Sequence, residues 1–171
     1  MIITQRLIIM RHDFLNVTIR KEIEWLNDKE VTKFSEQRHK IHDFNSQLAY
    51  ITASQKFGYL YQIWLGEKHI GNISAEPDPP NNTANMGILI GDKTEWGKGY
   101  GLEAWVAFMD FLFSCGFSKI EAGCMAENRA MELTCRRSGM AQEACIPSHF
   151  ILDNNPSCLL LFGKQNAKRT N

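Results

Sequence analysis

Three glycines at alternate positions, Gly97, Gly99 and Gly101, separate a predicted strand from a predicted helix. The strand ends in the apolar stretch 88–90, and the helix is indicated by apolar residues at helical spacing over 102–112. Glycine allows positive φ and lets a ligand approach the backbone without meeting a Cβ. A helix N-terminus attracts anions through its unpaired N–H groups and its macrodipole. The segment therefore predicts a loop that binds phosphate or pyrophosphate; a turn that needs glycine only for its conformation is the alternative.

The sequence of this loop partly matches two common nucleotide-binding motifs. The Walker motif fails because Asp92 stands where its first glycine belongs, and Gly99 replaces the metal-binding Ser or Thr. The run 99–104 fits the dinucleotide fingerprint, with Glu121 near the place of a ribose-binding acid. That fingerprint must follow a strand directly, whereas about eight residues separate Ile90 from Gly99. A Rossmann-type NAD(P) oxidoreductase therefore stays a less favoured alternative.

Chain length and charge balance narrow the class of protein further. With 171 residues, the chain is expected to form one domain over 1–165, followed by a polar tail at 166–171. Its 19 Lys and Arg residues balance 19 Asp and Glu residues, so no broad basic surface for nucleic acid is indicated. No apolar run reaches the ~18–20 residues that span a bilayer, so no membrane association is expected. The short apolar start at 1–10 is predicted to be a strand and not a signal peptide.

The order of the hydrophobic patterns predicts an α+β fold. Three successive strands precede the glycine loop, which argues against a uniform βαβ series. The prediction is a mixed, largely antiparallel sheet of about seven strands flanked by about four helices. Strands are expected at 3–11, 59–65, 69–75, 84–90, 120–125 and 159–162, with one more before the last. Helices are expected at 13–31, 41–55, 102–112 and 128–138, and loops at 76–82 and 153–156.

The five cysteines indicate neither a zinc site nor a redox motif. Their number is odd, they lie about ten residues apart, and none forms a Cys-x-x-Cys pair. Scattered cysteines in apolar surroundings are usually buried side chains and suit a reducing compartment. A cytoplasmic protein is therefore expected.

The glycine loop and several other segments resemble a known family. The run Trp96-Gly97-Lys98-Gly99-Tyr100-Gly101 is similar to the Gln/Arg-x-x-Gly-x-Gly/Ala acetyl-CoA loop of the GNAT acyltransferases. It most resembles the branch of the ribosomal-protein alanine acetyltransferases (RimJ/RimL-like), in which a Glu-Ala pair follows, here Glu103-Ala104. The resemblance spans nearly the whole chain in order. The other matching segments are 4–9, 25–31, 69–73, 128–130 and 139–140.

The resemblance implies direct transfer of an acetyl group from acetyl-CoA to a primary amine, with no metal. It implies that the amides of 97–101 hold the pyrophosphate. The open edge of the fourth predicted strand would pair with the pantetheine arm, because that strand diverges from the fifth, at 120–125. A backbone N–H near Leu89 would stabilise the oxyanion that forms from the thioester carbonyl. The expected cofactor-binding residues are Leu89, Ile90, Trp96, Gly97, Lys98, Gly99, Tyr100, Gly101 and Asn128.

The last predicted helix departs from the family pattern. Three and seven residues after Asn128, the family often has a Ser and a Tyr that protonates the leaving thiolate, but this chain has Met131 and Cys135. Met131 cannot donate a proton, whereas a thiol with the usual pKa of about 8.5 can. Cys135 is therefore a candidate general acid, and a buried apolar role is the favoured alternative.

Four residues are candidates for the general base that deprotonates the amine. Glu36 and His39 lie in the break between the first two helices, a segment that flanks the acceptor site in this family. Glu76 and His149 lie in or near predicted loops or strand ends. Glu36 is preferred and His149 comes second. Each also fits a solvated surface residue.

The acceptor class stays open at this stage. Proteins similar to this chain act on peptide N-termini, aminosugars or small polyamines, and the chain is expected to be a monomer or homodimer. An alternative to an enzyme is a CoA-binding regulatory or interaction protein that lost catalysis, because Met131 and Cys135 replace the expected polar residues.

Overall fold

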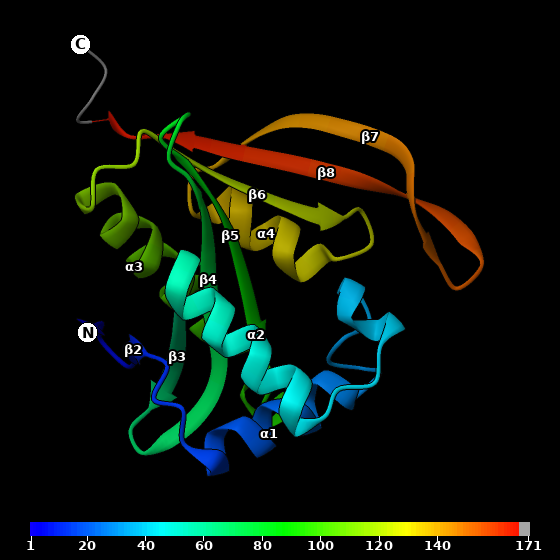
Figure 1. The fold of residues 1–171 in the computed structure, drawn as a ribbon. Helices are drawn as coiled ribbons and strands as arrows, with labels where there is room; N and C mark the ends of the chain where they lie inside the picture. The colour runs from blue at the N-terminus through cyan, green and yellow to red at the C-terminus, as the bar shows by residue number, and fades with distance from the viewer. Residues whose placement is uncertain (168–171) are drawn as a thin grey trace.

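A computed structural model of the protein describes residues 1–167 and shows one eight-stranded sheet with helices on both faces (Figure 1). The strands are β1 (Ile2–Ile3), β2 (Ile8–Arg11), β3 (Tyr59–Leu65), β4 (Lys68–Asp78), β5 (Thr83–Ile90), β6 (Lys119–Met125), β7 (Ala141–Leu152) and β8 (Asn155–Gln165). The α-helices are α1 (Asn16–Asn27), α2 (Phe44–Phe57), α3 (Tyr100–Ser114) and α4 (Arg129–Arg137), and the 3-10 helices are η1 (Glu36–His39) and η2 (Lys93–Glu95).

The strand order is β1-β2-β3-β4-β5-β6-β8-β7, and every neighbouring pair is antiparallel except β5 and β6. The predicted α+β class, with a mixed and largely antiparallel sheet, is confirmed. The described part of the chain has four α-helices, as expected, and eight strands where about seven were expected.

The two faces of the sheet bury separate apolar clusters. Trp105, Phe108 and Leu112 of α3 are fully buried against one face, together with Cys135 of α4. On the other face, Ile19 of α1 and Ile51 of α2 form a smaller cluster with strand β3. Figure 1 shows α2 lying across β3, β4 and β5, with α3 and α4 on the far side. Successive strand residues therefore point alternately to α3 and to the α1–α2 side.

The sheet opens near its middle, between β5 and β6. These parallel strands pair only at Thr83–Lys119, Ala84–Ile120 and Asn85–Glu121. Beyond these pairs the two strands diverge, as Figure 1 shows, so β5 has a strand partner on one side only from residue 86 to residue 90. The divergence implied by the family resemblance is present, and it creates an open backbone edge inside the sheet.

The single strand predicted at 3–11 is wrong, because two short antiparallel strands, β1 and β2, occupy this stretch. A turn separates them, in which the hydroxyl of Thr4 accepts the N–H of Leu7 at 2.9 Å. The carboxylate of Glu103 accepts the Thr4 hydroxyl at 2.6 Å and the Arg6 N–H at 2.9 Å. A partner so distant in sequence holds the turn against α3, and a local pattern cannot reveal it.

Both predicted loops are shorter than expected. Strand β4 continues through Pro77, and β8 includes Pro156, at positions where proline is tolerated next to a strand end. Asp153 and Asn154, with φ of 50° and 64°, form the tight turn between β7 and β8. The pairing of β7 with β8 is interrupted around Pro147. The sequence of this edge strand therefore shows no regular strand pattern.

The chain leaves the sheet after β8. Asn166, the first residue of the predicted tail 166–171, is buried and donates to the carbonyl oxygens of Phe113 and Phe117. Residues 168–171 of that tail lie outside the described residues. Within residues 1–167, none of the helices combines the length and apolar character that crossing a bilayer requires.

Candidate active site

The glycine loop leads from η2 into the first turn of α3. Gly97 and Gly99 have φ of 73° and 83°, a left-handed conformation that side chains disfavour. Gly99 is the N-cap of α3. Gly101 has no such requirement, and a Cβ there would make one ordinary contact within the chain, 3.7 Å from Ile90 Cγ1. Glycine at 101 therefore leaves space above the first turn of α3.

The N-terminus of α3 has the properties of an anion site. No side chain of residues 1–167 caps it, whereas the side chain of Asn128 caps α4 by accepting the N–H of Met131 at 3.2 Å. Residues 96–99 are exposed. The first amides of α3 are thus available to an external acceptor, and the macrodipole favours a negative one. The cap formed by Asn128 leaves α4 less suited to this role.

Charged side chains hold the glycine loop in place. The Arg6 guanidinium donates to the carbonyl of Lys98 at 3.0 Å and lies 4.5 Å from the ring centre of Tyr100. Lys68 and Lys98, both hydrogen-bonded to Glu95, lower the pKa of that carboxyl to about 2. The ammonium of Lys98 therefore holds the loop to η2, a role that the sequence did not predict.

The open edge of β5 carries defined backbone groups. The N–H of Gly91 donates to the carbonyl of Ile70 at 3.0 Å, so the backbone of Leu89 also faces β4 by antiparallel alternation. The N–H groups of Ile88 and Ile90 then face the divergence. The indole N–H of Trp96 donates to the carbonyl of Ile90 at 2.7 Å, at this same edge. Near Leu89, the N–H groups that face the divergence are therefore those of its two neighbours and not that of Leu89 itself.

Two cavities lie near this edge. The first, here called the α1–α2 cavity, has a volume of about 480 Å³ and lies between the two helices and the sheet; its lining includes Glu22, Gln47, Asn72, Ser74 and Leu89. The second, the divergence cavity, has a volume of about 520 Å³ and is lined by residues of β5, β6, β7 and β8. The segment around η1 borders both, because Gln37 lines the first and Glu36 the second.

Of the two preferred base candidates, Glu36 lines the divergence cavity, whereas His149 is next in sequence to a residue that lines it. The Glu36 side chain is 59% exposed and accepts a hydrogen bond from Arg38 at 2.8 Å. Arg38 also donates to the carbonyl of Ile151 at 3.1 Å, which ties η1 to β7. His149 is exposed on β7, with its ring edge-on to Phe150, a residue that lines the cavity with Glu36. Glu36 and the neighbour of His149 thus share one cavity.

Of the other candidates, His39 lies beside Glu36, whereas Glu76 and Cys135 lie on other elements. His39 is exposed, with Nε2 3.8 Å from Glu36, and Glu76 is exposed on β4 opposite Asn85. Cys135 is fully buried in the α3 cluster, and burial raises the pKa of its thiol to about 12. A thiol this reluctant to ionise is a poor nucleophile.

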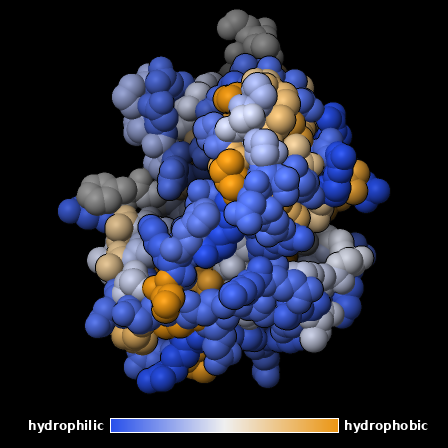
Figure 2. Space-filling model, turned by 90° about the vertical axis from the view of Figure 1, so that its right-hand side faces the viewer, coloured by the Kyte–Doolittle hydropathy of each residue, from blue (hydrophilic) through white to orange (hydrophobic). Residues whose placement is uncertain are grey.

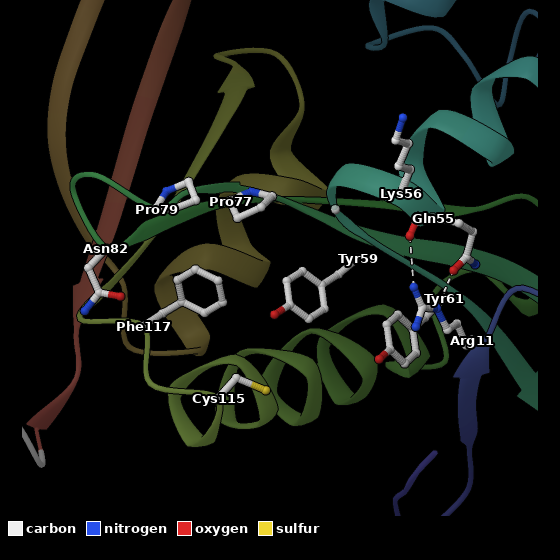
Figure 3. A pocket seen from close by; sticks show the side chains of 11 residues that line it. Arg11, Gln55, Lys56, Tyr59, Tyr61, Pro77, Pro79, Asn82, Cys115 and Phe117 are labelled. Carbon is white, nitrogen blue, oxygen red and sulfur yellow. Dashed lines mark hydrogen bonds between the residues drawn. The ribbon is translucent and has the colours of Figure 1, made fainter.

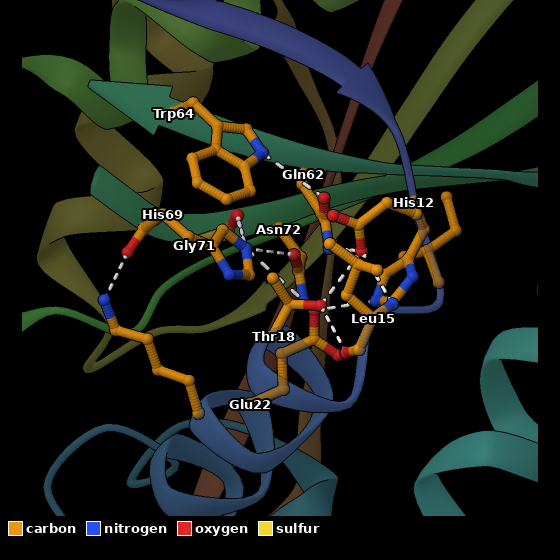
Figure 4. Close-up of polar contacts among 12 residues, drawn as sticks. His12, Leu15, Thr18, Glu22, Gln62, Trp64, His69, Gly71 and Asn72 are labelled. Atoms are coloured by element: carbon orange, nitrogen blue, oxygen red, sulfur yellow. Dashed lines mark hydrogen bonds and ion pairs between the residues drawn. The ribbon is translucent and has the colours of Figure 1, made fainter. Parts of the chain in front are cut away.

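A buried polar cluster beneath the α1–α2 cavity was missed by the sequence analysis (Figure 4). The Glu22 carboxylate lies 2.9 Å from His12 Nε2 and accepts the Gln47 amide at 2.8 Å, with a further contact from Asn72. Burial alone would raise the pKa of Glu22, but the hydrogen bonds and the electrostatic attraction of His12 outweigh it, and the pKa lies below its usual value. The available signal was a carboxylate one helical turn from Ile19, on the apolar face of α1.

A third cavity, of about 500 Å³, opens at the C-terminal end of α3 (Figure 3). Tyr59, Tyr61 and Phe117 line it, with Arg11 bound to the side chain and carbonyl of Gln55. The length of α3, roughly 20 Å, separates this cavity from the glycine loop. None of the site residues predicted from the sequence lines it.

Comparisons with known proteins agree with this geometry. A family model described as an acetyltransferase (GNAT) domain matches residues 14–141. No curated protein sequence matches the chain. Similar solved structures include a RimL ribosomal L7/L12 alpha-N-protein acetyltransferase in complex with coenzyme A, with 15% identity, coverage of 96% of this chain and 97% of that chain, and a TM-score of 0.84.

Two further structures extend the likeness. The spermidine N-acetyltransferase from Vibrio cholerae, in complex with CoA and spermine, has 14% identity, coverage of 98% and 100%, and a TM-score of 0.85. The microcin C7 self-immunity acetyltransferase MccE, in complex with acetyl-CoA and AMP, has 16% identity, coverage of 95% and 93%, and a TM-score of 0.79. At these identities the likeness shows a shared fold.

Proposed function

Because the chain belongs to the GNAT acetyltransferase family, which its match over 14–141 shows, we propose that it is an acetyl-CoA-dependent N-acetyltransferase of the RimJ/RimL-like kind. The observation that carries the proposal is the divergence of β5 from β6, which leads to the uncapped N-terminus of α3. An extended thioester arm and a pyrophosphate are the two parts of acetyl-CoA that such an edge and such a helix end would bind. We assign the activity to a single cytoplasmic domain, 1–165.

In this proposal, separate groups of residues bind the cofactor, stabilise the oxyanion and accept the proton. The amides of 97–101 bind the pyrophosphate, with Trp96, Lys98 and Tyr100 shaping the loop around them. The outward N–H of Ile88 or Ile90 donates to the thioester oxygen as it becomes an oxyanion; a donor of this kind contributes about 3–4 kcal/mol in a serine protease. The amine attacks at the open edge of β5, near the segment around η1 that borders both cavities. Glu36, or His149 as the second candidate, takes the proton of the amine.

Related structures indicate the range of acceptors. By their names, the RimL protein acts on the N-terminus of a ribosomal protein and the Vibrio cholerae enzyme acts on spermidine. We propose a primary amine of a small molecule, an aminosugar or a peptide N-terminus for this chain. The competing function, CoA binding without catalysis, is motivated by Met131 and Cys135 in α4.

A thermal-shift comparison tests the cofactor. Acetyl-CoA at 100 times its Kd should stabilise the fold by about 2.7 kcal/mol, which raises Tm by roughly 5–10 °C in a chain of this size. NAD(P) should leave Tm unchanged. A rise in Tm with NAD(P) but not with acetyl-CoA would favour a Rossmann-type oxidoreductase instead. Steady release of CoA thiol with an amine library then separates an enzyme from a protein that only binds CoA.

Replacement of Cys135 by alanine tests the order of the chemical steps. We expect Cys135→Ala to keep at least a few per cent of kcat, whereas loss of a true general acid typically costs about 10²–10⁴-fold. Double-reciprocal plots with both substrates varied should intersect, because the amine and the thioester meet in one ternary complex. Parallel plots together with an acetyl group trapped on Cys135 would overturn direct transfer.

A further inference from the structure

Paired charges, and not apolar patches, are the more informative features of the protein surface. Figure 2 shows that the molecular face formed by the right-hand side of Figure 1 is largely hydrophilic, with apolar side chains in separate patches. One ion pair joins two elements that are far apart in sequence. It links Arg6, in the turn between β1 and β2, to Glu103, in the first turn of α3. Because α3 begins at the candidate anion site, this pair affects what that site can bind.

Glu103 places a negative charge where an anionic ligand would bind. Its backbone N–H donates to the carbonyl of Gly99, the N-cap residue, at 3.1 Å, so Glu103 begins the hydrogen-bonded part of α3. An acidic side chain in the first turn stabilises the helix itself, because it faces the positive end of the macrodipole. The same carboxylate repels an anion that approaches the free amides of this turn. A phosphate-binding site at this helix end therefore needs the charge of Glu103 to be compensated.

Arg6 supplies this compensation. Its Nε and Nη2 each lie 2.6 Å from Oε2 of Glu103, and the hydroxyl of Thr4 donates to Oε1 at 2.6 Å. Burial alone would raise the pKa of Glu103, but the hydrogen bonds from Thr4 and Arg6 and the attraction of the guanidinium hold it below its usual value. Glu103 is therefore an ionised carboxylate whose charge is balanced by one guanidinium.

The same guanidinium fixes the direction of one amide of the glycine loop. Nη1 of Arg6 donates to the carbonyl of Lys98 at 3.0 Å. In a planar trans peptide, the carbonyl and the N–H that follows it point in opposite directions. The peptide from Lys98 to Gly99 is trans, so the N–H of Gly99 points away from Arg6. Within residues 1–167 this N–H has no hydrogen-bond acceptor, which leaves it for a ligand beside the free amides of α3.

We propose that Arg6 is a positioning residue for the acetyl donor, which makes the start of α3 able to bind a diphosphate by balancing Glu103 and by directing the N–H of Gly99. The word donor rests on the proposed function; the diphosphate site itself does not. Arg6 acts through the loop and needs no contact with the ligand. The binding of the nucleotide half of acetyl-CoA then depends on Arg6, whereas the binding of the thioester arm along β5 does not.

Two acetyl donors test this assignment in the full chain. Acetyl-CoA carries the diphosphate, whereas S-acetylpantetheine has the same thioester arm without it. Arg6→Gln should lower kcat/KM for acetyl-CoA at least tenfold, about 1.4 kcal/mol, and should leave kcat/KM for S-acetylpantetheine within twofold. Arg20→Gln is the matched control, because it removes the same charge from an exposed position on α1 and should leave both values within twofold. An equal loss with the two donors in Arg6→Gln is the result of a damaged fold and would overturn the proposal.

A double variant tests the compensation of charge. In Arg6→Gln, the carboxylate of Glu103 is left without its cation beside the anion site, so its removal should restore part of the binding. Arg6→Gln combined with Glu103→Gln should therefore bind acetyl-CoA at least threefold more tightly than Arg6→Gln alone, as measured by calorimetry. If Arg6 served only the stability of the fold, the loss of a second side chain would give no such gain. A double variant that binds no more tightly would contradict the proposal.

Arg6→Lys keeps the test decisive if Arg6→Gln does not fold. Lysine keeps the positive charge near Glu103 but lacks the planar guanidinium that reaches Glu103 and the carbonyl of Lys98 together. We expect kcat/KM to fall at least threefold with acetyl-CoA and to stay within twofold with S-acetylpantetheine. Equal values in Arg6→Lys and the wild-type protein for both donors would show that the direction of the loop amide does not depend on Arg6.

The nucleotide half of CoA separates this inference from the proposed function. The probe is 3′-phospho-ADP, which has a diphosphate and no thioester arm, so its binding requires no acetyl transfer. Calorimetry should detect its binding to the wild-type protein and at least tenfold weaker binding to Arg6→Gln. If this difference is found and no amine is acetylated, the proposed function fails and the role of Arg6 stands. If acetyl transfer occurs while the probe binds both proteins equally, or does not bind the wild-type protein, the role of Arg6 fails and the proposed function stands.

Discussion

Replacement of Gly99 by aspartate is expected to weaken the binding of acetyl-CoA at least tenfold, about 1.4 kcal/mol. Gly99 is the N-cap of α3 and has a φ of 83°, so any side chain there adds strain. A carboxylate at an N-cap also accepts the free amides of the helix, which are the donors proposed for the pyrophosphate. Its negative charge then repels the ligand. Calorimetric titration of acetyl-CoA measures the loss.

Two controls separate charge from strain. Gly99→Asn has nearly the same shape and tolerates positive φ, so binding weaker in Gly99→Asp than in Gly99→Asn reports the charge. Gly66→Asp introduces the same side chain at a φ of 59°, in the turn between β3 and β4, where a Cβ meets nothing within 4 Å. It should bind acetyl-CoA as the wild-type protein does. Unchanged affinity in a folded Gly99→Asp protein would refute the assignment of the loop.

Replacement of Gly71 by alanine should lower the free energy of unfolding by about 3 kcal/mol, near the upper end of overpacking effects. A Cβ at this buried position of β4 would overlap the carbonyl oxygen of Leu89 and lie 2.9 Å from the Cα of Ile90. Both are backbone atoms of β5, so relief requires the two strands to separate beside the open edge. The pairing that aims the N–H groups of Ile88 and Ile90 would be lost with it.

Chemical denaturation and thermal melting measure this effect, with Tm expected to fall by roughly 6–12 °C. Gly87→Ala is the matched control on β5, because a Cβ there makes one ordinary contact, 3.5 Å from the hydroxyl oxygen of Ser74. Its stability should stay within about 0.5 kcal/mol of wild type. Equal stability of the Gly71 and Gly87 variants would show that β4 and β5 separate without cost.

The parts of the fold that the sequence predicted well depend on local patterns. The aromatic and β-branched residues of β3 and the apolar spacing in α3 are each visible within one element. The turn at Thr4 depends instead on Glu103, and β7 is interrupted around Pro147. Distant partners and broken strand pairing leave no periodic signal, so these elements were misplaced or left without bounds.

The candidate site follows the same division. The glycine loop was recognisable because its conformation requires glycine at 97 and 99, whatever the rest of the chain does. The cluster around Glu22 unites residues from β4, α1, α2 and the segment after β2, and none of these segments carries a motif. Only tertiary structure shows that Glu22 is buried and held by His12 and Gln47. The general base stays a prediction, because Glu36 and His149 are both exposed and only Glu36 lines the divergence cavity.

The divergence of β5 from β6 also affects the tendency of the protein to aggregate. A strand at the outer rim of a sheet offers its backbone groups to strands of other molecules. The unpaired edge of β5 lies inside the sheet, where β6 and β8 stand across the gap and the pairs at 83–85 close one end. A thin, flexible ligand fits into the gap between β5 and β6. A strand from a second protein does not, because its side chains and neighbouring strands would clash with β6 and β8. The protein can therefore keep a permanently unpaired strand edge without the exposure to self-association that an edge at the rim would bring.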